Sequence, residues 1–395
     1  MWIERKIGGR LLELLHHFPA VILTGPRQSG KTSLLQRLLP GWRFVSLDLP
    51  SLAEEAEKRP LQFLEKFPPP VIVDEVQYAP GLFRHLKVAI DADRTLNGRF
   101  ILTGSQKFQL MSAVSDSLAG RCAILELHTL SAAELEAARR PDSAGWLDFI
   151  LRGGFPELCA EPGLPAADFF RAYISTYLER DVRNLLQVGN LRDFERFIRV
   201  TAIRSGSLLN LSDIARDVGI APSTARHWLS VLEASGIVLL VEPYFNNLGK
   251  RIVKTPKSYV MDTGLLCHLL GISSVSTLLE SPFLGSIWES FVCGQIAREL
   301  QLKPTAASLW FWRDAHGLEV DFLLDVGSRF ELVECKWTEN PGKDDAAPMG
   351  KLRAVLEKNR PVRCRVACRA SNSFPLAENV EAVNGFLERE WVREG

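Results

Sequence analysis

The stretch Val21–Leu35, VILTGPRQSGKTSLL, decides the fold of the first part of the chain. Its apolar run Val21–Leu23 leads into a glycine-rich segment, and SLLQRLL then repeats apolar residues at helical spacing. The residues from Gly25 to Thr32 fit the pattern G-x-x-x-x-G-K-[ST], in the strand–loop–helix context that this pattern requires. The stretch therefore predicts a loop that binds the phosphates of a nucleotide.

We expect this loop to bind ATP together with Mg²⁺. Its glycines let backbone N–H groups wrap around an anionic phosphate, and the start of the following helix adds a favourable dipole. Lys31 is expected to reach the β- and γ-phosphates, and the Thr32 hydroxyl to bind Mg²⁺. The predicted nucleotide-binding residues are Gly25, Pro26, Arg27, Gln28, Ser29, Gly30, Lys31, Thr32 and Ser33.

Two further apolar runs supply the expected catalytic residues. Val71–Val73 is a continuous apolar run, typical of a strand buried on both faces of a parallel sheet, and it ends in Asp74 and Glu75. Asp74 can complete the Mg²⁺ shell, and Glu75 can polarise the attacking water. Ile101–Thr103 predicts the next strand, and Ser105 follows it at a position where a polar side chain can sense the γ-phosphate.

Strands alternate with helices through this part of the chain, which predicts an α/β fold with a doubly wound parallel sheet. The segments GPRQSGKT, VIVDE and TGSQ resemble the AAA+ branch of the P-loop ATPases. In that family an arginine just before the last core strand often acts on the nucleotide of a neighbouring subunit. Arg121, in the segment LAGR, stands at the matching position. The resemblance implies a catalytic role for Arg121 and, if it acts in trans, a homo-oligomer; a surface arginine or one acting in cis is the alternative.

Length and composition indicate the class of protein and the number of domains. A chain of 395 residues with 46% hydrophobic and 24% charged residues is typical of a globular protein of two or three domains. Lys plus Arg and Asp plus Glu are both 47, so net charge favours neither a nucleic-acid nor a membrane partner. The seven cysteines are scattered, and no apolar run approaches the ~20 residues that span a bilayer. We therefore expect a cytoplasmic protein with reduced thiols.

The middle of the chain is predicted to hold a helical lid, as the resemblance implies, and then a helix-turn-helix. Leu211–Val218, Gly219 and the segment PSTARHWLSVLEASG read as helix, turn and helix, followed by an apolar strand and the basic arm GKRIVKTPK of a wing. The second helix would present Ser223, Thr224, Arg226 and His227. The wing gathers Lys250, Arg251, Lys254 and Lys257, which suit contacts to DNA phosphates. A protein-binding or structural role is the alternative, and both stay open.

The last third contains the stretch Glu319–Trp337, EVDFLLDVGSRFELVECKW, which predicts a hairpin and a metal site. Glu334 and Lys336 are two residues apart and so project from one face of a strand, beside Asp321 on the preceding strand. Asp321 and Glu334 could hold a metal ion, Lys336 could activate water, and Glu289 could support them from a helix. These residues resemble the PD-(D/E)xK nuclease family, although Val320 departs from its pattern. A scaffold, or a site that binds nucleic acid without cutting, remains an alternative.

The order of motifs along the whole chain resembles a prokaryotic AAA+ ATPase family with a C-terminal domain of unknown function. We expect four parts: a nucleotide-binding domain at residues 1–130, a helical lid at 131–190, a winged helix at 191–260 and a nuclease-like domain at 261–395. The predicted function is Mg²⁺-dependent ATP hydrolysis, coupled to a C-terminal half that acts on DNA. The alternatives are an ATP-regulated, metal-dependent DNA nuclease and a nucleotide-gated regulator that binds DNA or protein without cleavage.

Overall fold

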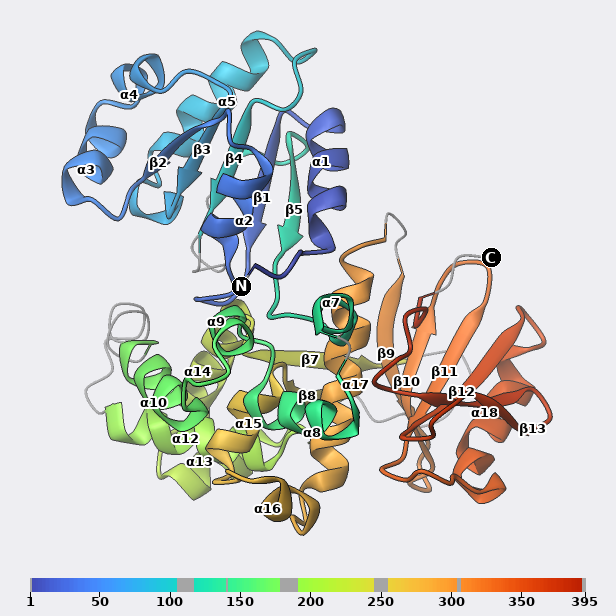
Figure 1. Cartoon of the computed structure of the whole chain (residues 1–395). Coiled ribbons are helices and arrows are strands. Elements are labelled where there is room, and N and C mark those ends of the chain that lie inside the picture. The colour runs from blue at the N-terminus through green and yellow to red at the C-terminus, as the bar shows by residue number, and fades with distance from the viewer. Residues whose placement is uncertain are drawn as a thin grey trace. The chain divides into compact units, whose positions relative to one another are not determined.

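The computed structural model describes residues 2–104, 117–139, 141–177, 191–244, 255–303 and 307–392. The chain forms two compact units (Figure 1). The N-terminal unit is Glu4–Leu130 with Ala234–Gly236, and the C-terminal unit is Ser131–Glu233 and Ile237–Gly395 with Met1–Ile3. The lid, winged helix and nuclease-like part, which the sequence predicts as separate domains, thus lie together in one unit.

A parallel sheet forms the centre of the N-terminal unit. Its strands are β1 (Ala20–Thr24), β2 (Arg43–Ser46), β3 (Val71–Asp74), β4 (Phe100–Thr103) and β5 (Cys122–Glu126). They pair in the order β2-β3-β4-β1-β5, and every pair is parallel. The helices are α1 (Ile7–His17), α2 (Lys31–Leu38), α3 (Pro50–Lys58), α4 (Pro60–Lys66) and α5 (Leu82–Ala92), with a 3₁₀ turn η1 (Val76–Tyr78). The predicted α/β fold with a parallel sheet is confirmed.

Both faces of this sheet are buried, which explains why its central strands are continuously apolar. One face packs against α3, α4 and α5, with Phe63 and Leu86 contributing to a core that also includes Ile22 and Val73. Residues that point to the other face, such as Val21, are also fully buried. The core therefore fixes the carboxyl ends of β1, β3 and β4 side by side.

The C-terminal unit combines helices with a large mixed sheet. Its helices are α7 (Ala132–Arg139), α8 (Ser143–Arg152), α9 (Pro156–Ala160), α10 (Ala166–Tyr177), α12 (Leu191–Ile203), α13 (Leu211–Val218), α14 (Pro222–Ala234), α15 (Thr263–Leu269), α16 (Val275–Leu279), α17 (Leu284–Leu300) and α18 (Ala347–Leu356), with a 3₁₀ turn η3 (Lys343–Ala346). Its strands are β6 (Ser207–Leu208), β7 (Val238–Pro243), β8 (Lys257–Val260), β9 (Ser308–Arg313), β10 (Glu319–Asp325), β11 (Phe330–Cys335), β12 (Val362–Cys368), β13 (Phe374–Ala377) and β14 (Val380–Asn384).

One sheet joins the helix-turn-helix region to the last third of the chain. Its order is β13-β14-β12-β11-β10-β9-β7-β8-β6. The junction is the parallel pair β7–β9, in which Glu242 lies opposite Trp310, and Tyr244 N–H donates to the Phe311 carbonyl over 2.7 Å. Because backbone hydrogen bonds cross this junction, β8 is held at a fixed register relative to β9 and β10.

The helix-turn-helix is held together by an aromatic cluster and a glycine turn. Phe194 and Phe197 of α12 contact Trp228 of α14, with ring centroids 5.1 and 5.5 Å apart. Gly219 follows α13 with a φ of 84°, a left-handed conformation that ends a helix and that glycine adopts without strain. The predicted helix, turn and helix are confirmed at these bounds.

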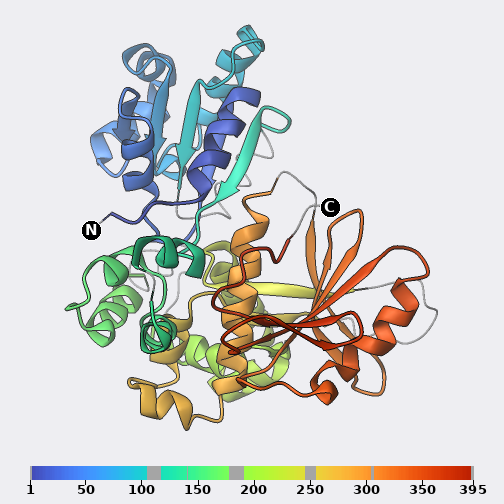
Figure 2. The ribbon, with the colours of Figure 1, turned by 45° about the vertical axis from the view of Figure 1, so that its right-hand side comes forward.

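Helix α17 is buried along most of its length because it packs inside the C-terminal unit (Figure 2). Trp288 stacks on Phe291 with centroids 5.4 Å apart, and its indole N–H donates to the Ala367 carbonyl at 3.0 Å. Among the described residues, no helix is long and apolar enough to cross a membrane.

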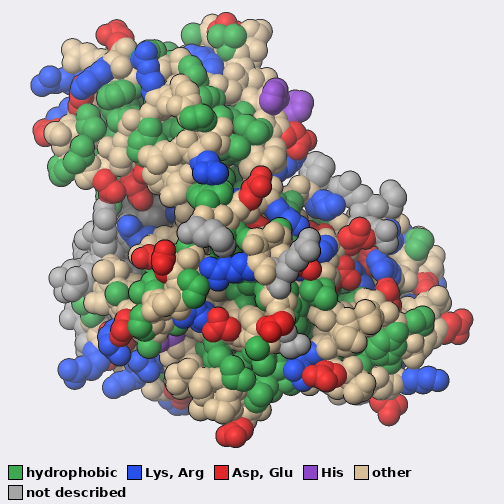
Figure 3. Space-filling model, viewed as in Figure 1, with side chains coloured by type: hydrophobic (Ala, Val, Ile, Leu, Met, Phe, Trp, Pro, Cys, Tyr) green, Lys and Arg blue, Asp and Glu red, His purple; other side chains and the backbone are tan. Residues whose placement is uncertain are grey.

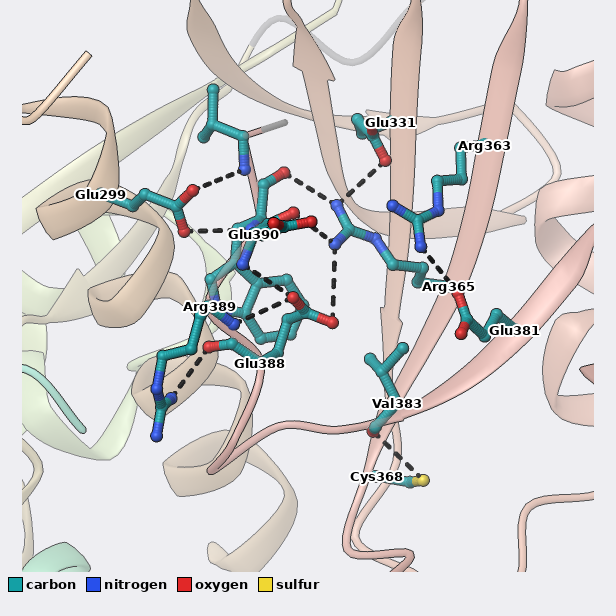
Figure 4. A network of polar contacts seen from close by, with 12 residues as sticks. Glu299, Glu331, Arg363, Arg365, Cys368, Glu381, Val383, Glu388, Arg389 and Glu390 are labelled. Carbon is teal, nitrogen blue, oxygen red and sulfur yellow. Dashed lines mark hydrogen bonds and ion pairs between the residues drawn. The ribbon is translucent and has the colours of Figure 1, made fainter. Parts of the chain in front are cut away.

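A polar network fixes the segment Phe386–Val392 to the sheet (Figure 4). The fully buried Arg365 of β12 donates to the buried Glu331 at 3.0 Å and to the carbonyl oxygens of Glu390 and Trp391, both at 2.8 Å. Glu299 of α17 accepts from the backbone N–H groups of Trp391 and Val392, both at 3.0 Å. Four backbone polar groups at the end of this segment therefore have partners in the side chains of Arg365 and Glu299.

Candidate functional site

The glycine-rich loop lies between β1 and α2, as the sequence predicts. Lys31 begins α2, and its ammonium donates to the carbonyl oxygens of Gly25 and Pro26, both at 2.9 Å. A Cβ on Gly25 would overlap the Leu127 carbonyl oxygen, and its φ of 133° excludes most other residues. Gly30 has a φ of 89°, which turns the chain into the helix. The lysine is thus folded over the loop where phosphates would be bound.

The loop has buried polar atoms that suit an anionic ligand. The hydroxyls of Thr24 and Ser29 are buried and have no hydrogen-bond partner in the described part of the chain. Buried polar groups in native proteins normally have partners, so two such hydroxyls in and beside one loop indicate a place for a ligand. These atoms, the loop backbone and Lys31 fit the phosphates of a nucleotide.

Asp74 lies at the carboxyl end of β3 and contacts two threonines. It accepts a hydrogen bond from Thr103 at the end of β4 and another from Thr32 of α2 at 3.3 Å. Burial raises the pKa of Asp74, and the hydrogen bond from Thr103 opposes this shift. The Thr32 hydroxyl and the Asp74 carboxylate are oxygen donors next to the loop, the type of ligand that Mg²⁺ prefers.

Glu75 follows in a strained backbone conformation. Its φ is 53°, in the left-handed region that costs a residue other than glycine about 1–3 kcal/mol. Its carboxylate accepts a hydrogen bond from the amide of Gln77, and its backbone N–H donates to Thr103 at 3.4 Å. Such strain persists only where the surrounding structure enforces it, often at functional sites. The enforced backbone conformation and the hydrogen bond from Gln77 therefore give the Glu75 carboxylate a fixed direction beside the loop.

Arg121 lies away from the loop. It precedes β5, at the amino edge of a parallel sheet whose carboxyl edge carries the loop. Its guanidinium forms two hydrogen bonds to Asp91, at 2.8 and 2.9 Å, and these hold the pKa of Asp91 at about 2. Arg121 therefore does not reach the loop of its own chain. Ser105 lies outside the described residues.

Arg5 supports the loop through contacts that the sequence does not reveal. Its guanidinium donates to the carbonyl oxygens of Ser29 at 2.8 Å and His128 at 2.7 Å. Arg5 lies 24 residues before Ser29 and carries no motif. The sequence analysis also missed Gln77, which is not part of a motif either. Its hydrogen bond to the Glu75 carboxylate depends on the turn that η1 makes.

The predicted DNA-contact residues of α14 lie on its outer face. Ser223, Arg226 and His227 are exposed and Thr224 is half-buried, whereas Trp228 faces the core. Lys250, Arg251 and Lys254 lie outside the described residues.

Arginines also gather on the helices next to α14. Figure 3 shows Lys and Arg side chains, at its lower left, over α10, α12 and α13. Exposed arginines of α10 and α12 are Arg171, Arg192, Arg196 and Arg199. Several of them have acidic neighbours: Arg171 pairs with Asp168 at 3.2 Å and Arg196 with Asp193 at 3.9 Å.

The expectation for Lys257 is wrong. The sequence places it with the basic residues of the wing that contact phosphates, but its side chain is 3% exposed. It begins β8 and forms ion pairs with Glu289 at 2.9 Å and with Glu319. The signal that could have indicated a buried cation is a lysine at the start of the short strand KSYV, which has no other charged residue.

The predicted nuclease residues do come together. Asp321 of β10 accepts from the Cys335 N–H at 2.8 Å, and Lys336, just beyond β11, pairs with Glu334 at 3.1 Å. Glu289 of α17 accepts from the Tyr259 hydroxyl at 2.5 Å. We call Glu289, Glu319, Asp321 and Glu334, with Lys257 and Lys336, the acidic centre. The sequence analysis missed Glu319 and Tyr259.

Burial dominates the ionisation of the acidic centre. Burial, then the charge of Asp321, raises the pKa of Glu289 to about 7 and that of Glu334 to about 8. Burial also raises the pKa of Asp321, and Lys257 opposes this shift. For Lys257, burial lowers the pKa, but Glu289, Asp321 and Glu319 outweigh it and raise it. Within the described ranges, no group of three His, Cys, Asp or Glu is arranged to hold a metal ion.

Three families match parts of the chain. Residues 17–136 match the family described as AAA domain, residues 143–276 match a domain of unknown function (DUF8612), and residues 284–385 match another, DUF4143. The uncharacterized Mycobacterium tuberculosis protein Rv2008c is 33% identical over 97% of this chain and 84% of its own length. The Mycobacterium bovis protein Mb2031c gives the same figures.

Solved structures of P-loop proteins are similar at a lower level. The Walker-type ATPase PABY2304 of Pyrococcus abyssi has a TM-score of 0.48 at 18% identity, covering 68% of this chain and 96% of its own. The ORC2 protein of Aeropyrum pernix has a TM-score of 0.35 at 15% identity, covering 69% and 92%. At these scores the likeness carries no functional inference.

Proposed function

The chain is an AAA-type ATPase with a C-terminal DUF4143 region and belongs to one family with Rv2008c, and on this premise we propose that it binds Mg²⁺-ATP at the glycine-rich loop and hydrolyses it. The observation that carries the proposal is the position of Lys31, folded over the loop carbonyls beside the Thr32–Asp74 pair.

Each residue of the site has a part in this proposal. The loop N–H groups and Lys31 bind the phosphates, and release of the lysine from the carbonyls of Gly25 and Pro26 frees its ammonium for them. Thr32 and Asp74 would hold Mg²⁺, which when bound neutralises charge on the phosphate oxygens. Glu75 is the general base for water, and Gln77 keeps its carboxylate in place.

The test separates binding from hydrolysis. Lys31→Ala is expected to abolish ATP binding, measured with a fluorescent ATP analogue, because the loop then lacks its cation. Glu75→Gln is expected to keep binding and to lose turnover, because an amide cannot accept the proton of water. Lys58→Ala is the control, since Lys58 is an exposed helix residue paired with Glu54. Normal ATP turnover by Lys31→Ala would contradict the proposal.

We further propose that the C-terminal unit contacts DNA and that nucleotide state controls this contact. Support comes from the order α12, β6, α13, α14, β7, β8, which is that of a winged helix, and from the exposed outer face of α14. Loss of γ-phosphate contacts on hydrolysis is the usual basis of such control. A role as a protein-binding regulator is the alternative outcome.

A labelled DNA duplex tests this second proposal. Binding should weaken steeply between about 50 and 200 mM salt, because phosphate contacts release counterions. Arg226→Ala, and separately Lys250→Ala with Arg251→Ala, should weaken binding, whereas Lys351→Ala on α18 should not. A difference between ATP and ADP would support nucleotide control. Equal binding by all variants would exclude α14 and the basic arm as the contact surface.

A further inference from the structure

A buried lysine lies among the carboxylates of the acidic centre. Lys257 Nζ is 2.9 Å from Glu289 Oε1 and 3.7 Å from Asp321 Oδ1, and it forms an ion pair with Glu319. An ammonium has three N–H donors, and these three carboxylates come from α17 and β10. The lysine thus provides the positive charge in a place where the sequence predicts a metal ion.

The position of this lysine is fixed by the sheet. In β8, Lys257 lies opposite Val241 of β7 on one side and Leu208 of β6 on the other. The backbone of Lys257 is therefore held by pairing on both sides, so the ammonium can leave the carboxylates only if the side chain itself turns away. Tyr259, two residues further along the same strand, donates to the same Glu289 oxygen at 2.5 Å.

Glu334 is a further buried carboxylate of the centre, and its ion-pair partner is Lys336 rather than Lys257. Its Oε2 atom is buried without a hydrogen-bond partner among the described residues, while its other oxygen pairs with Lys336 at 3.1 Å. The Glu334 side chain is 7% exposed. A buried carboxylate oxygen without a partner is rare in native proteins, and here the charge of the carboxylate is balanced through its other oxygen by Lys336.

The carboxylates surround an ammonium, not a metal ion. Lys257 Nζ lies at ion-pair distances of 2.9 Å from Glu289 and 3.7 Å from Asp321, so the ammonium fills the space between these carboxylates. The described residues contain no group of three such side chains arranged to hold a metal, so the carboxylates must draw closer together before they can bind one in place of the ammonium. A metal ion and the Lys257 ammonium cannot occupy the same space.

We propose that Lys257 is the resident cation of the acidic centre: its ammonium takes the place of a divalent metal ion between Glu289, Glu319 and Asp321. The native chain then binds no Mg²⁺ or Mn²⁺ there and does not cleave phosphodiesters. Removing the amine turns the centre into a site for one divalent cation with oxygen ligands. This inference does not depend on ATP binding at the loop.

Mn²⁺ binding to nucleotide-free protein tests the proposal, because the electron paramagnetic resonance signal of free Mn²⁺ counts the ions bound per chain. Native protein and Asp321→Asn should bind equally little. Lys257→Met should gain one Mn²⁺ per chain, and Lys257→Met with Asp321→Asn should lose it again. Lys351→Met, which removes an exposed lysine from the same unit, should behave as the native chain does.

Two results would overturn the proposal. One is a Mn²⁺ ion in the native chain that Asp321→Asn removes, because the centre would then already hold a metal beside Lys257. The other is no gain of Mn²⁺ in a folded Lys257→Met variant. If that variant is unfolded, Mn²⁺ must restore its native circular dichroism, since the ion would replace the missing charge; failure to do so also counts against the proposal.

Discussion

Replacing Arg365 with Met tests whether a buried ion pair holds the C-terminal segment in place. Arg365 and Glu331 are both fully buried, 3.0 Å apart, and the guanidinium also donates to two backbone carbonyls (Figure 4). Removing one partner of a buried pair costs about 3–5 kcal/mol. Glu331 keeps Arg329 at 2.7 Å, so its charge is not left alone, and we expect the lower end, about 3 kcal/mol.

The matched control is Arg363→Met, at a position two residues before Arg365 on β12. Arg363 pairs with Glu381 at 2.7 Å, but both side chains are about a third exposed, at 32% and 38%. An exposed pair contributes about 0–1 kcal/mol, so Arg363→Met should lower the free energy of unfolding by no more than that. Arg365→Met with Glu331→Met should recover only part of the single-variant loss, about 1 kcal/mol, because Glu331 is then no longer buried with Arg329 as its remaining partner, while the carbonyls of Glu390 and Trp391 still lack their donor.

Urea unfolding followed by tryptophan fluorescence gives these values for the C-terminal unit. Of the nine tryptophans, all but Trp42 belong to that unit, so the signal reports its transition. The reasoning would be refuted if Arg365→Met and Arg363→Met lowered the unfolding free energy equally. A double variant less stable than Arg365→Met would also contradict it.

Three further predictions concern the two candidate sites. Gly25→Ala should lose ATP binding and about 1–3 kcal/mol of unfolding free energy, because its Cβ would overlap the Leu127 carbonyl at a positive φ; Gly41→Ala, in open space, is the control, and equal binding by both variants would contradict the loop geometry. Arg121→Ala should lower ATP turnover only where subunits associate, as checked by light scattering beside the assay; the same loss in a strictly monomeric preparation would exclude a role in trans. Glu334 has a folded-state pKa of about 8, above its unfolded value of about 4.3, so its contribution to stability is complete below about pH 4 and is lost as the pH rises through about 8. The urea midpoint of the native chain should therefore fall between about pH 5 and about pH 9, and Glu334→Gln should flatten that fall; parallel curves for the two proteins would show that Glu334 is not the group responsible.

The sequence by itself determined the nucleotide-binding loop, because its residues are consecutive. Gly25, Gly30 and Lys31 shape one turn between a strand and a helix, and that turn needs no contact from elsewhere to be recognised. The apolar runs ending at Asp74 and Thr103 placed both residues at the same sheet edge, since carboxyl ends of parallel strands share one edge. The bounds of the helix-turn-helix followed from helical periodicity and Gly219 in the same way.

Only the tertiary structure decided the partners that lie far apart in the chain. Arg5 reaches Ser29 across 24 residues, and Lys257 reaches Glu289 across 32, neither of which any local pattern contains. The decisive contact is the pairing of β7 with β9, which carries β8 and its lysine to the acidic residues of β10 and α17. A strand can pair with several others of similar hydrophobicity, so the choice of β9 as the partner of β7 depends on the packing of the whole unit. That choice also decides that Lys257 is the cation among the carboxylates of the acidic centre.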